Sequence, residues 1–360
     1  MAYNMILSEV KKLLAAAMNR PDIDSIPDGL CMGDWPEWDS MAHVALLVGI
    51  QERYGFMPAP EEIPETISLP RLVTFLEGKL GGYSKSKADI SSQDGWNTVF
   101  DNLFGGDDMP PDICIYIHSR TAPLIGAGFG GLDRLIDLLR GKDGTRTLVF
   151  PAFPFSSRSY KGYIASRPPF KVKSTSAFTG LLPELVRAGS RDLYRSAHPL
   201  LSEMAVGPKA KWIVSEAHTA SDPFHPLSTY RRLMEDDAIM VGLGLDMNTN
   251  AIIHYVDDHF KDRYPFPVYL PEPLDFDIEF EDGHVETRSY LAYSPDMVRR
   301  IKPRNLRPYF SATPEIVREI SCNGVSFFRL RIKPFLEKCT ALAESALNIG
   351  ELPPWFVNVP

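Results

Sequence analysis

One histidine of this sequence has acidic residues at helical spacing on its C-terminal side. His254 is followed by Asp257 three residues later and by Asp258 four residues later, so either carboxylate can share a helix face with the imidazole. Imidazole titrates at about pH 6.5 and suits a general base, and a neighbouring carboxylate would orient the ring and stabilise imidazolium. A lone histidine after a strand is also a common core residue. The spacing therefore indicates a candidate base with two candidate carboxylate partners.

The same segment and the cysteines argue against a metal or nucleotide site. His259 lies five residues after His254, which puts the two imidazoles on different helix faces and disfavours a shared metal. The glycines at 126–131 do not form a GxGxxG turn that follows a strand and has an acidic partner, so a dinucleotide site is disfavoured. The cysteines have no CxxC spacing and read as reduced thiols of a cytosolic protein; they are Cys31, Cys114, Cys322 and Cys339.

A serine at a predicted helix start offers a second kind of chemistry. Asp39-Ser40-Met41 precedes an apolar helical pattern, and the N-terminal end of a helix favours a phosphodiester through its backbone N–H groups and its dipole. This tripeptide and the layout of residues 1–80 resemble an acyl carrier protein, whose Asp-Ser-Leu signature takes a 4'-phosphopantetheine arm on the serine. The resemblance implies an arm on Ser40, with a phosphopantetheinyl transferase and an acyl-loading enzyme as partners. Alternatively, Asp39 and Ser40 only cap the helix.

Separated motifs between residues 113 and 310 resemble the aminoglycoside 3-N-acetyltransferase family, which moves an acyl group from a coenzyme A thioester to an amine. Each motif alone is weak, but all keep their order over almost two hundred residues. They are Ile117-His118-Ser119 and the glycines that follow, Asp143-Gly144-Thr145 with LVFPAF, Gly180 to Arg187, Arg195-Ser196-Ala197-His198-Pro199 with Ser202 and Gly207, His218, Pro226 and Ser228, Gly242 and Gly244, Asn248-Thr249, and His254.

This resemblance implies an N-acyltransferase in which His254 is the general base and Asp257 orients it. It further implies that the pantetheine thioester arm meets a second set of residues, and that the acceptor is an amine-bearing small molecule. An ordinary strand-end turn would equally explain the first two members of that set, and His198 could simply pin a loop. The set is His118, Ser119, Arg195, Ser196 and Thr249.

Hydrophobic periodicity predicts the elements that must position these residues. Residues 1–80 repeat apolar positions at three- and four-residue steps and predict a small all-α bundle of about three helices. Residues 81–95 are rich in Gly and Ser and predict a flexible linker. Residues 96–360 alternate strand and helix patterns, beginning with a strand at 113–118, and predict an α/β domain. A helix after the strand at 238–245 is expected to begin near Asn248-Thr249 and to contain His254.

Composition sets the remaining limits. The 360 residues are 44% hydrophobic and 23% charged, with a net charge of −8, which predicts a folded chain and argues against a nucleic-acid binder. No apolar run reaches about 18 residues and the start is too polar for a signal peptide, so a cytoplasmic protein with no membrane segment is expected.

The leading hypothesis is thus a carrier domain fused to an N-acyltransferase that modifies an amino sugar or a similar biosynthetic intermediate, with acyl-CoA as a possible donor. One alternative is an acetyl-CoA-dependent aminoglycoside acetyltransferase with a vestigial carrier. Another is a non-catalytic carrier or scaffold protein, which the presence of His254 in its motif disfavours.

Overall fold

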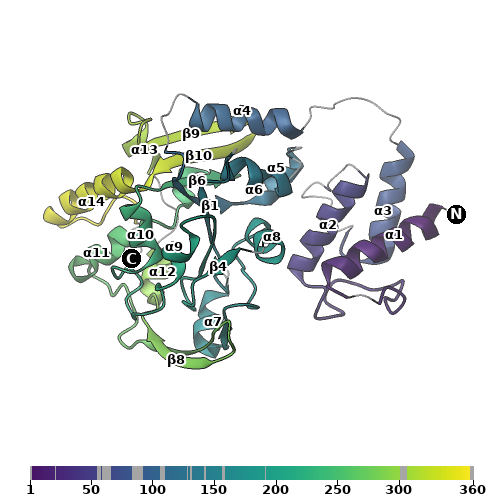
Figure 1. The fold of residues 1–360 in the computed structure, drawn as a ribbon, viewed down its shortest axis with the longest axis horizontal. Helices are drawn as coiled ribbons and strands as arrows, with labels where there is room; N and C mark the ends of the chain where they lie inside the picture. The colour runs from purple at the N-terminus through teal and green to yellow at the C-terminus, as the bar shows by residue number, and fades with distance from the viewer. Residues whose placement is uncertain are drawn as a thin grey trace. The chain divides into compact units, whose positions relative to one another are not determined.

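A computed structural model describes most of the chain and divides it into two compact units, Met1–Ser92 and Gln93–Pro360. Figure 1 colours the chain from purple at its start to yellow at its end. The described residues are 2–20, 22–54, 58, 66–82, 92–105, 110–127, 129, 132–141, 143–155, 159–190, 192–300 and 306–356.

The described residues of the smaller unit form three helices, in line with the prediction for residues 1–80: α1 (Ala2–Ala17), α2 (Ser40–Tyr54) and α3 (Leu69–Gly82). Helix α1 packs against both of the others. Their apolar stripes meet in one core in which Val10, Leu46 and Leu72 are fully buried, because each amphipathic helix can hide its stripe only against another element.

The loop between α1 and α2 is held in place by its own contacts. Trp38 is fully buried, and its indole Nε1–H donates to His43 Nδ1 at 3.3 Å. The carboxylate of Asp39 accepts hydrogen bonds from the backbone N–H groups of Met41 and Ala42, both at 2.9 Å. Asp39 is therefore the N-cap of α2, and two of the N–H groups that the sequence offered to a phosphate are already bonded.

The larger unit has a seven-stranded mixed sheet and a three-stranded sheet, which confirms the predicted α/β class. The order in the large sheet is β4-β5-β2-β1-β6-β10-β9, with β2, β1 and β6 parallel and the remaining pairs antiparallel. The small sheet has the order β3-β7-β8. The strands are β1 (Cys114–Ser119), β2 (Thr147–Pro151), β3 (Phe170–Lys171), β4 (Leu193–Arg195), β5 (Glu203–Val206), β6 (Ile239–Leu243), β7 (Leu274–Glu279), β8 (Val285–Tyr290), β9 (Val317–Cys322) and β10 (Val325–Arg331).

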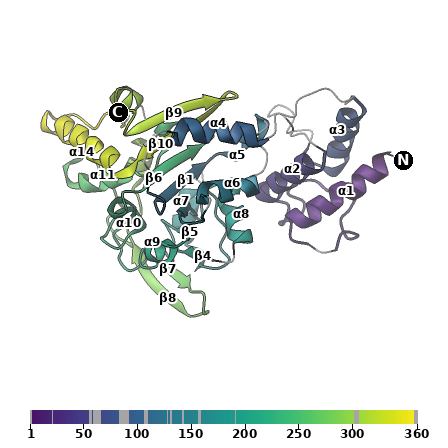
Figure 2. The same ribbon diagram turned by 45° about the horizontal axis from the view of Figure 1, so that its top comes forward.

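Helices cover both faces of the large sheet, which explains why its central strands are continuous apolar runs. On one face Tyr116 of β1 and Phe328 of β10 join a core that includes residues of α9, α10, α11 and α14. On the other face Phe327 meets the ring of Trp96 from α4 at 6.3 Å. Figures 1 and 2 both show α4 beside β9 and β10. The helices are α4 (Ser92–Phe104), α5 (Thr121–Gly126), α6 (Leu132–Arg140), α7 (Tyr160–Ser166), α8 (Leu181–Gly189), α9 (Ala210–Val214), α10 (Thr229–Glu235), the 3-10 helix η2 (Met247–Thr249), α11 (His254–His259), the 3-10 helix η3 (Lys261–Arg263), α12 (Pro295–Arg300), α13 (Arg307–Phe310) and α14 (Ile332–Asn348).

The predicted linker at 81–95 overlaps two helix ends. Helix α3 continues to Gly82, and α4 begins at Ser92; residues 83–91 lie outside the described residues. Helix α4 belongs to the larger unit's packing, since Arg318 of β9 donates to the carbonyls of Asn102 and Leu103 near its C-terminal end at 3.4 and 3.3 Å.

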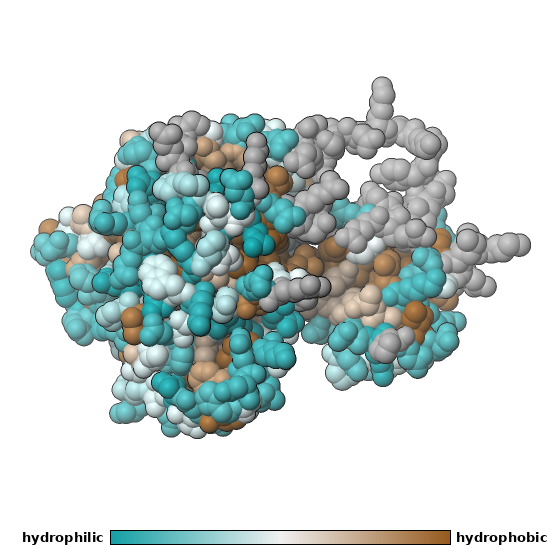
Figure 3. Space-filling view, in the orientation of Figure 1, coloured by the Kyte–Doolittle hydropathy of each residue, from teal (hydrophilic) through white to brown (hydrophobic). Residues whose placement is uncertain are grey.

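Polar residues cover most of the surface of the larger unit on the face shown in Figure 3, where apolar residues form only small groups. Among the described residues, no helix combines the length and apolar composition that a membrane span requires.

Gly242, in the middle of β6, gives a test of how tightly this sheet is packed. Its backbone lies between His118 of β1 and Phe328 of β10, and a Cβ at this position would stand 1.9 Å from the Phe328 ring. We expect Gly242→Ala to lower the free energy of unfolding by about 1–3 kcal/mol through overpacking, measured by urea titration. The control is Gly162→Ala in α7, where a Cβ meets nothing within 4 Å and alanine favours the helix. Equal stability of the two variants would contradict this packing.

Candidate active site

The two residues predicted as base and orienting carboxylate lie side by side in α11. His254 is the first residue of this helix, and its Nδ1 lies 2.9 Å from Asp257 Oδ2. The His254 side chain is 15% exposed and that of Asp257 is 1% exposed. An imidazole whose Nδ1 faces a buried carboxylate presents Nε2 as its basic nitrogen, which is the arrangement of a general base with its orienting acid.

The spacing in the sequence left Asp257 and Asp258 as two candidate partners of His254, and the structure shows different contacts for each. Asp258 accepts a hydrogen bond from the Tyr269 hydroxyl at 2.8 Å and pairs with Lys261 at 3.0 Å. Tyr269 stacks on Tyr293, and the Tyr293 ring lies 5.2 Å from the His254 ring at an angle of 45°. Asp258 therefore supports the aromatic wall beside the imidazole, while Asp257 orients the imidazole itself.

The prediction that this helix begins near Asn248-Thr249 was wrong. These residues form part of η2, a separate turn in which the Asp246 carboxylate accepts from the Asn248 N–H at 2.8 Å. Asn250 then returns to extended backbone, and its Oδ1 accepts from the Ile253 N–H at 3.3 Å. The short polar side chains thus compete for the backbone and end the first turn before α11 begins. Thr249 is exposed, and its N–H donates to the Asp246 carbonyl at 3.1 Å.

His118 and Ser119 end strand β1 at the carboxyl edge of the parallel strands, from which β6 also leads toward α11. Open α/β sheets bind their ligands at this edge. His118 lies two residues after Tyr116 and therefore on the same face of the sheet, the face whose core includes α10 and α11. Burial lowers the pKa of His118 to about 3. Within the described part of the chain, His118 Nε2 and Ser119 Oγ are buried without a hydrogen-bond partner.

Arg195 and Ser196 lie in a buried network that joins loops of the larger unit. The guanidinium of Arg195 donates to Ser202 Oγ and to the Ala152 carbonyl, both at 2.9 Å, and also to the Thr175 carbonyl. Ser196 Oγ accepts from the Glu203 N–H at 3.0 Å. These contacts use the polar groups of both residues to hold backbone in place, which is the role of a structural network.

His198 likewise fixes a loop, one of the two alternatives the sequence left open for it. Its Nδ1 accepts from the Leu200 and Leu201 N–H groups at 3.1 and 3.0 Å. Two donors facing Nδ1 leave no room for a proton there, and burial lowers the pKa of His198 to about 3.

This arrangement predicts acid sensitivity. Between pH 6.5 and about 3, His198 is protonated in the unfolded chain and neutral in the folded chain. The free energy of unfolding therefore falls as the pH drops through this range, by at most about 1.4 kcal/mol per pH unit. His198→Asn keeps an acceptor oxygen and should lose about 2 kcal/mol less than the wild type between pH 7 and pH 5 in urea titrations. His259→Asn, at an exposed position, should keep the wild-type difference, and an unchanged difference in His198→Asn would show that His198 charges freely.

A buried carboxyl group that the sequence analysis did not select lies next to this network. Glu203, in β5, is 1% exposed, and burial raises its pKa well above the usual range, against the opposing effect of the Thr229 and Ser196 hydroxyls. Burial raises the pKa of Tyr116 and of Tyr230, and the nearby Glu203 carboxyl adds to both shifts. An acidic residue inside the otherwise apolar strand Glu203–Val206 was the signal that could have found it.

Trp355 is a second residue that the sequence analysis missed. Its Nε1–H donates to Asp257 Oδ1 at 2.9 Å, and the two residues are 98 positions apart in the sequence. No motif or periodicity in the sequence predicts this contact.

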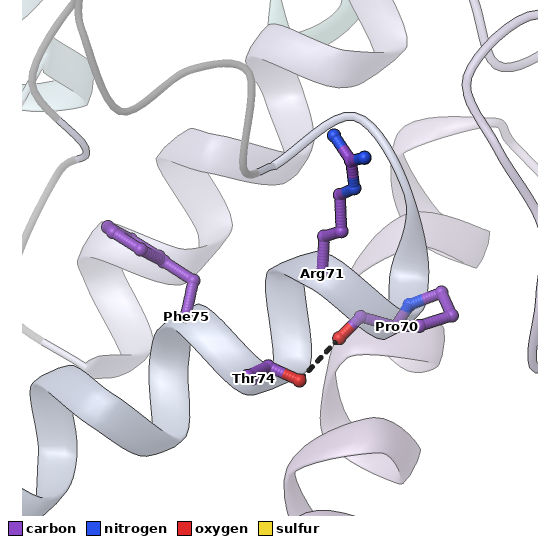
Figure 4. A pocket seen from close by; sticks show the side chains of 4 residues that line it. All are labelled: Pro70, Arg71, Thr74 and Phe75. Atoms are coloured by element: carbon purple, nitrogen blue, oxygen red, sulfur yellow. Dashed lines mark hydrogen bonds between the residues drawn. The ribbon is translucent and has the colours of Figure 1, made fainter.

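Two surface hollows lie elsewhere. One, of about 300 Å³, is lined by Pro70, Arg71, Thr74 and Phe75 of α3, with Thr74 Oγ1 donating to the Pro70 carbonyl at 2.9 Å (Figure 4). The other, of about 530 Å³, lies where β4 begins and β5 ends, and its lining includes Arg140, Asp192 and Lys211. Neither contains a predicted site residue. Among the residues that the structure describes, no group of three His, Cys, Asp or Glu side chains is arranged to hold a metal ion.

Comparison with known proteins agrees with the fold of the larger unit. Residues 118–343 match the model of the aminoglycoside 3-N-acetyltransferase family. The chain is similar to the crystal structure of aminoglycoside acetyltransferase AAC(3)-Xa, with 20% identity and a TM-score of 0.50 over 71% of this chain and 92% of that chain. It is similar to apo AAC(3)-IVa, with 18% identity and a TM-score of 0.51 over 72% and 90%. It is also similar to AAC-IIIb in a binary complex with CoASH, with 18% identity and a TM-score of 0.50 over 65% and 90%. No curated protein sequence matches the chain.

Proposed function

Because this chain belongs to the aminoglycoside 3-N-acetyltransferase family, it is an amine N-acyltransferase, and we propose that His254 is the base that makes the acceptor amine nucleophilic. An amine is mostly protonated at neutral pH and cannot attack a thioester until it loses a proton. The observation that supports this assignment is the 2.9 Å contact between His254 Nδ1 and Asp257 Oδ2 at the start of α11.

The proposed reaction uses Nε2 of His254 and the amine directly. The ammonium form of the acceptor first loses one proton to solvent. Nε2 then takes a second proton, from the neutral amine, as the amine nitrogen bonds to the thioester carbonyl carbon. The carbon–sulfur bond then breaks, and the thiolate of coenzyme A leaves with the proton that the imidazolium returns. Asp257 stabilises the imidazolium between these steps, because a buried carboxylate next to Nδ1 favours the charged ring.

We propose an aminoglycoside or a related amino sugar as the acceptor and acyl-CoA as the donor. The acceptor class follows from the family and from solved relatives, among them a variant of AAC(3)-IVa in complex with apramycin. The donor follows from the complex of AAC-IIIb with CoASH.

The deciding experiment combines the purified full chain with acetyl-CoA and a panel of aminoglycosides and simple amino sugars, and follows thiol release together with the mass of the acylated product. An acylated amine product that the wild type forms and the His254→Ala variant does not form would support the proposal. Thioester hydrolysis alone, with no acylated amine, would contradict it.

A second proposal concerns residues 1–80, which the family match at 118–343 does not include. We propose that this unit is an acyl carrier and that Ser40 takes a 4'-phosphopantetheine arm from a phosphopantetheinyl transferase. Ser40 opens the 15-residue helix α2 directly after Asp39, and helix starts favour a phosphodiester through the dipole. When attached, the arm supplies a thiol that an acyl-loading enzyme can charge.

A carrier fits a biosynthetic acyltransferase better than a resistance enzyme. A donor tethered to the same chain has an effective concentration in about the millimolar range, which an enzyme that draws on free acetyl-CoA does not need. The net charge of residues 1–80, with 12 acidic and 6 basic residues, also suits a unit that docks onto basic partner surfaces. Membership of an enzyme family favours this reading over a non-catalytic scaffold.

A further inference from the structure

Both oxygens of the Asp257 carboxylate have a partner, and the two partners come from distant parts of the chain. Oδ2 faces His254 Nδ1 at 2.9 Å, three residues away, and Oδ1 accepts from Trp355 Nε1 at 2.9 Å. Trp355 lies beyond residues 118–343, the part of the chain that matches the family model. The partner of Oδ1 therefore comes from a segment that the family match does not include.

The chemistry of the indole fixes the direction of this hydrogen bond. An indole N–H can only donate and has no acceptor form, so Oδ1 is always the acceptor. Asp257 is 1% exposed at its side chain and Trp355 is 1% exposed, so water does not substitute easily for either group. A carboxylate held at one oxygen cannot rotate freely, and its other oxygen is kept toward His254 Nδ1.

Trp355 itself is held by the packing of its own segment. The Phe356 N–H donates to the Pro353 carbonyl at 3.0 Å, and the Phe356 ring packs edge-on against Tyr264 at 5.2 Å and Phe266 at 5.5 Å. Burial raises the pKa of Tyr264, and the Asp257 carboxylate adds to this shift. The residues after α14 thus pack onto the segment that follows α11.

We propose that Trp355 is a positioning residue for the acyl transfer: its hydrogen bond fixes the rotamer of Asp257, and Asp257 in turn keeps the His254 proton on Nδ1 and the basic lone pair on Nε2. This inference rests on the proposed role of His254. It assigns to the segment after α14 a share of the catalytic arrangement, in addition to its packing in the core.

The test is a double-mutant cycle of Trp355→Phe and Asp257→Asn in the full chain, with Trp212→Phe as the matched control at a tryptophan that is 41% exposed. Phenylalanine keeps most of the apolar contact and removes the N–H. We expect Trp355→Phe to lower kcat by about 10- to 100-fold with KM for both substrates unchanged. The double variant should be no slower than Asp257→Asn alone, because Trp355 acts only through that carboxylate.

Additive losses in the cycle, or an equal fall in kcat for Trp212→Phe, would show that Trp355 serves the core only and would overturn the inference. A normal kcat in Trp355→Phe together with a large loss in His254→Ala would also overturn it while leaving the proposed function intact. A normal kcat in His254→Ala would instead refute the proposed function.

A readout independent of activity is the indole N–H resonance of Trp355 in a ¹H–¹⁵N spectrum, identified by its absence in Trp355→Phe. We expect this signal to lie downfield of the other indoles and to move upfield in Asp257→Asn, as the acceptor loses its charge. A resonance that does not respond to Asp257→Asn would show that the hydrogen bond is absent in solution.

Discussion

Replacement of His254 by alanine is expected to lower kcat by about 10²- to 10⁴-fold, the usual value of general-base help. KM for the thioester should change little, since the imidazole acts on the amine. Asp257→Asn should lose less, because it disturbs the orientation of the ring and the stability of imidazolium while the base itself remains. Steady-state kinetics with thiol release as the signal would measure both. His259→Ala, an exposed histidine of the same helix, is the matched control and should keep wild-type kcat.

The acyl group is expected to pass directly to the amine. Cys114 and Cys339 are buried, Cys322 is partly exposed and Cys31 is exposed. Burial raises the pKa of the Cys114 thiol, which makes it a poor nucleophile. An acyl-cysteine trapped on the larger unit, or near-normal turnover in His254→Ala, would refute this mechanism.

Ser40→Ala is expected to abolish attachment of the phosphopantetheine arm completely. Incubation of the full chain with coenzyme A and a broad-specificity phosphopantetheinyl transferase should add the mass of one arm to the wild type and none to the variant, by intact-mass spectrometry. Ser25→Ala is the control in the same unit; its hydroxyl donates to the Asp22 carbonyl at 2.8 Å, and this variant should be modified fully. An unmodified wild type, with a known carrier modified in parallel, would refute the carrier proposal, and modification of Ser40→Ala would place the arm elsewhere.

The elements that sequence could predict are those whose burial is uniform or periodic. Strand β1 lies between β2 and β6 and is covered on both faces, so its residues 114–117 read as a continuous apolar run. Helices α1 and α3 show amphipathic stripes. Strands β3 and β4, of two and three residues, could not be predicted, because segments so short depend on the neighbours with which they pair.

The contacts of the site also differ in whether the sequence could predict them. His254 and Asp257 are three residues apart, so a local rule brings them together. The same rule could not choose between Asp257 and Asp258, because the choice depends on Tyr269, whose hydroxyl bonds to Asp258. Trp355 reaches Asp257 through tertiary packing alone. The sequence also could not show that the Arg195 guanidinium donates hydrogen bonds to backbone carbonyls.

The contact between Asp257 and Trp355 has a consequence for the newly made chain. Ribosomes add about 5–20 residues per second, and the two residues are 98 positions apart, so Asp257 waits about 5–20 s for the donor that bonds its Oδ1. During that interval α11 lacks both this hydrogen bond and its packing against α14. The Asp257 carboxylate, which is buried in the complete chain, must then remain in contact with water. A nascent chain paused before residue 355 would therefore expose the region around α11 to proteases and chaperones, even when the strands β1, β2 and β6 have already been made.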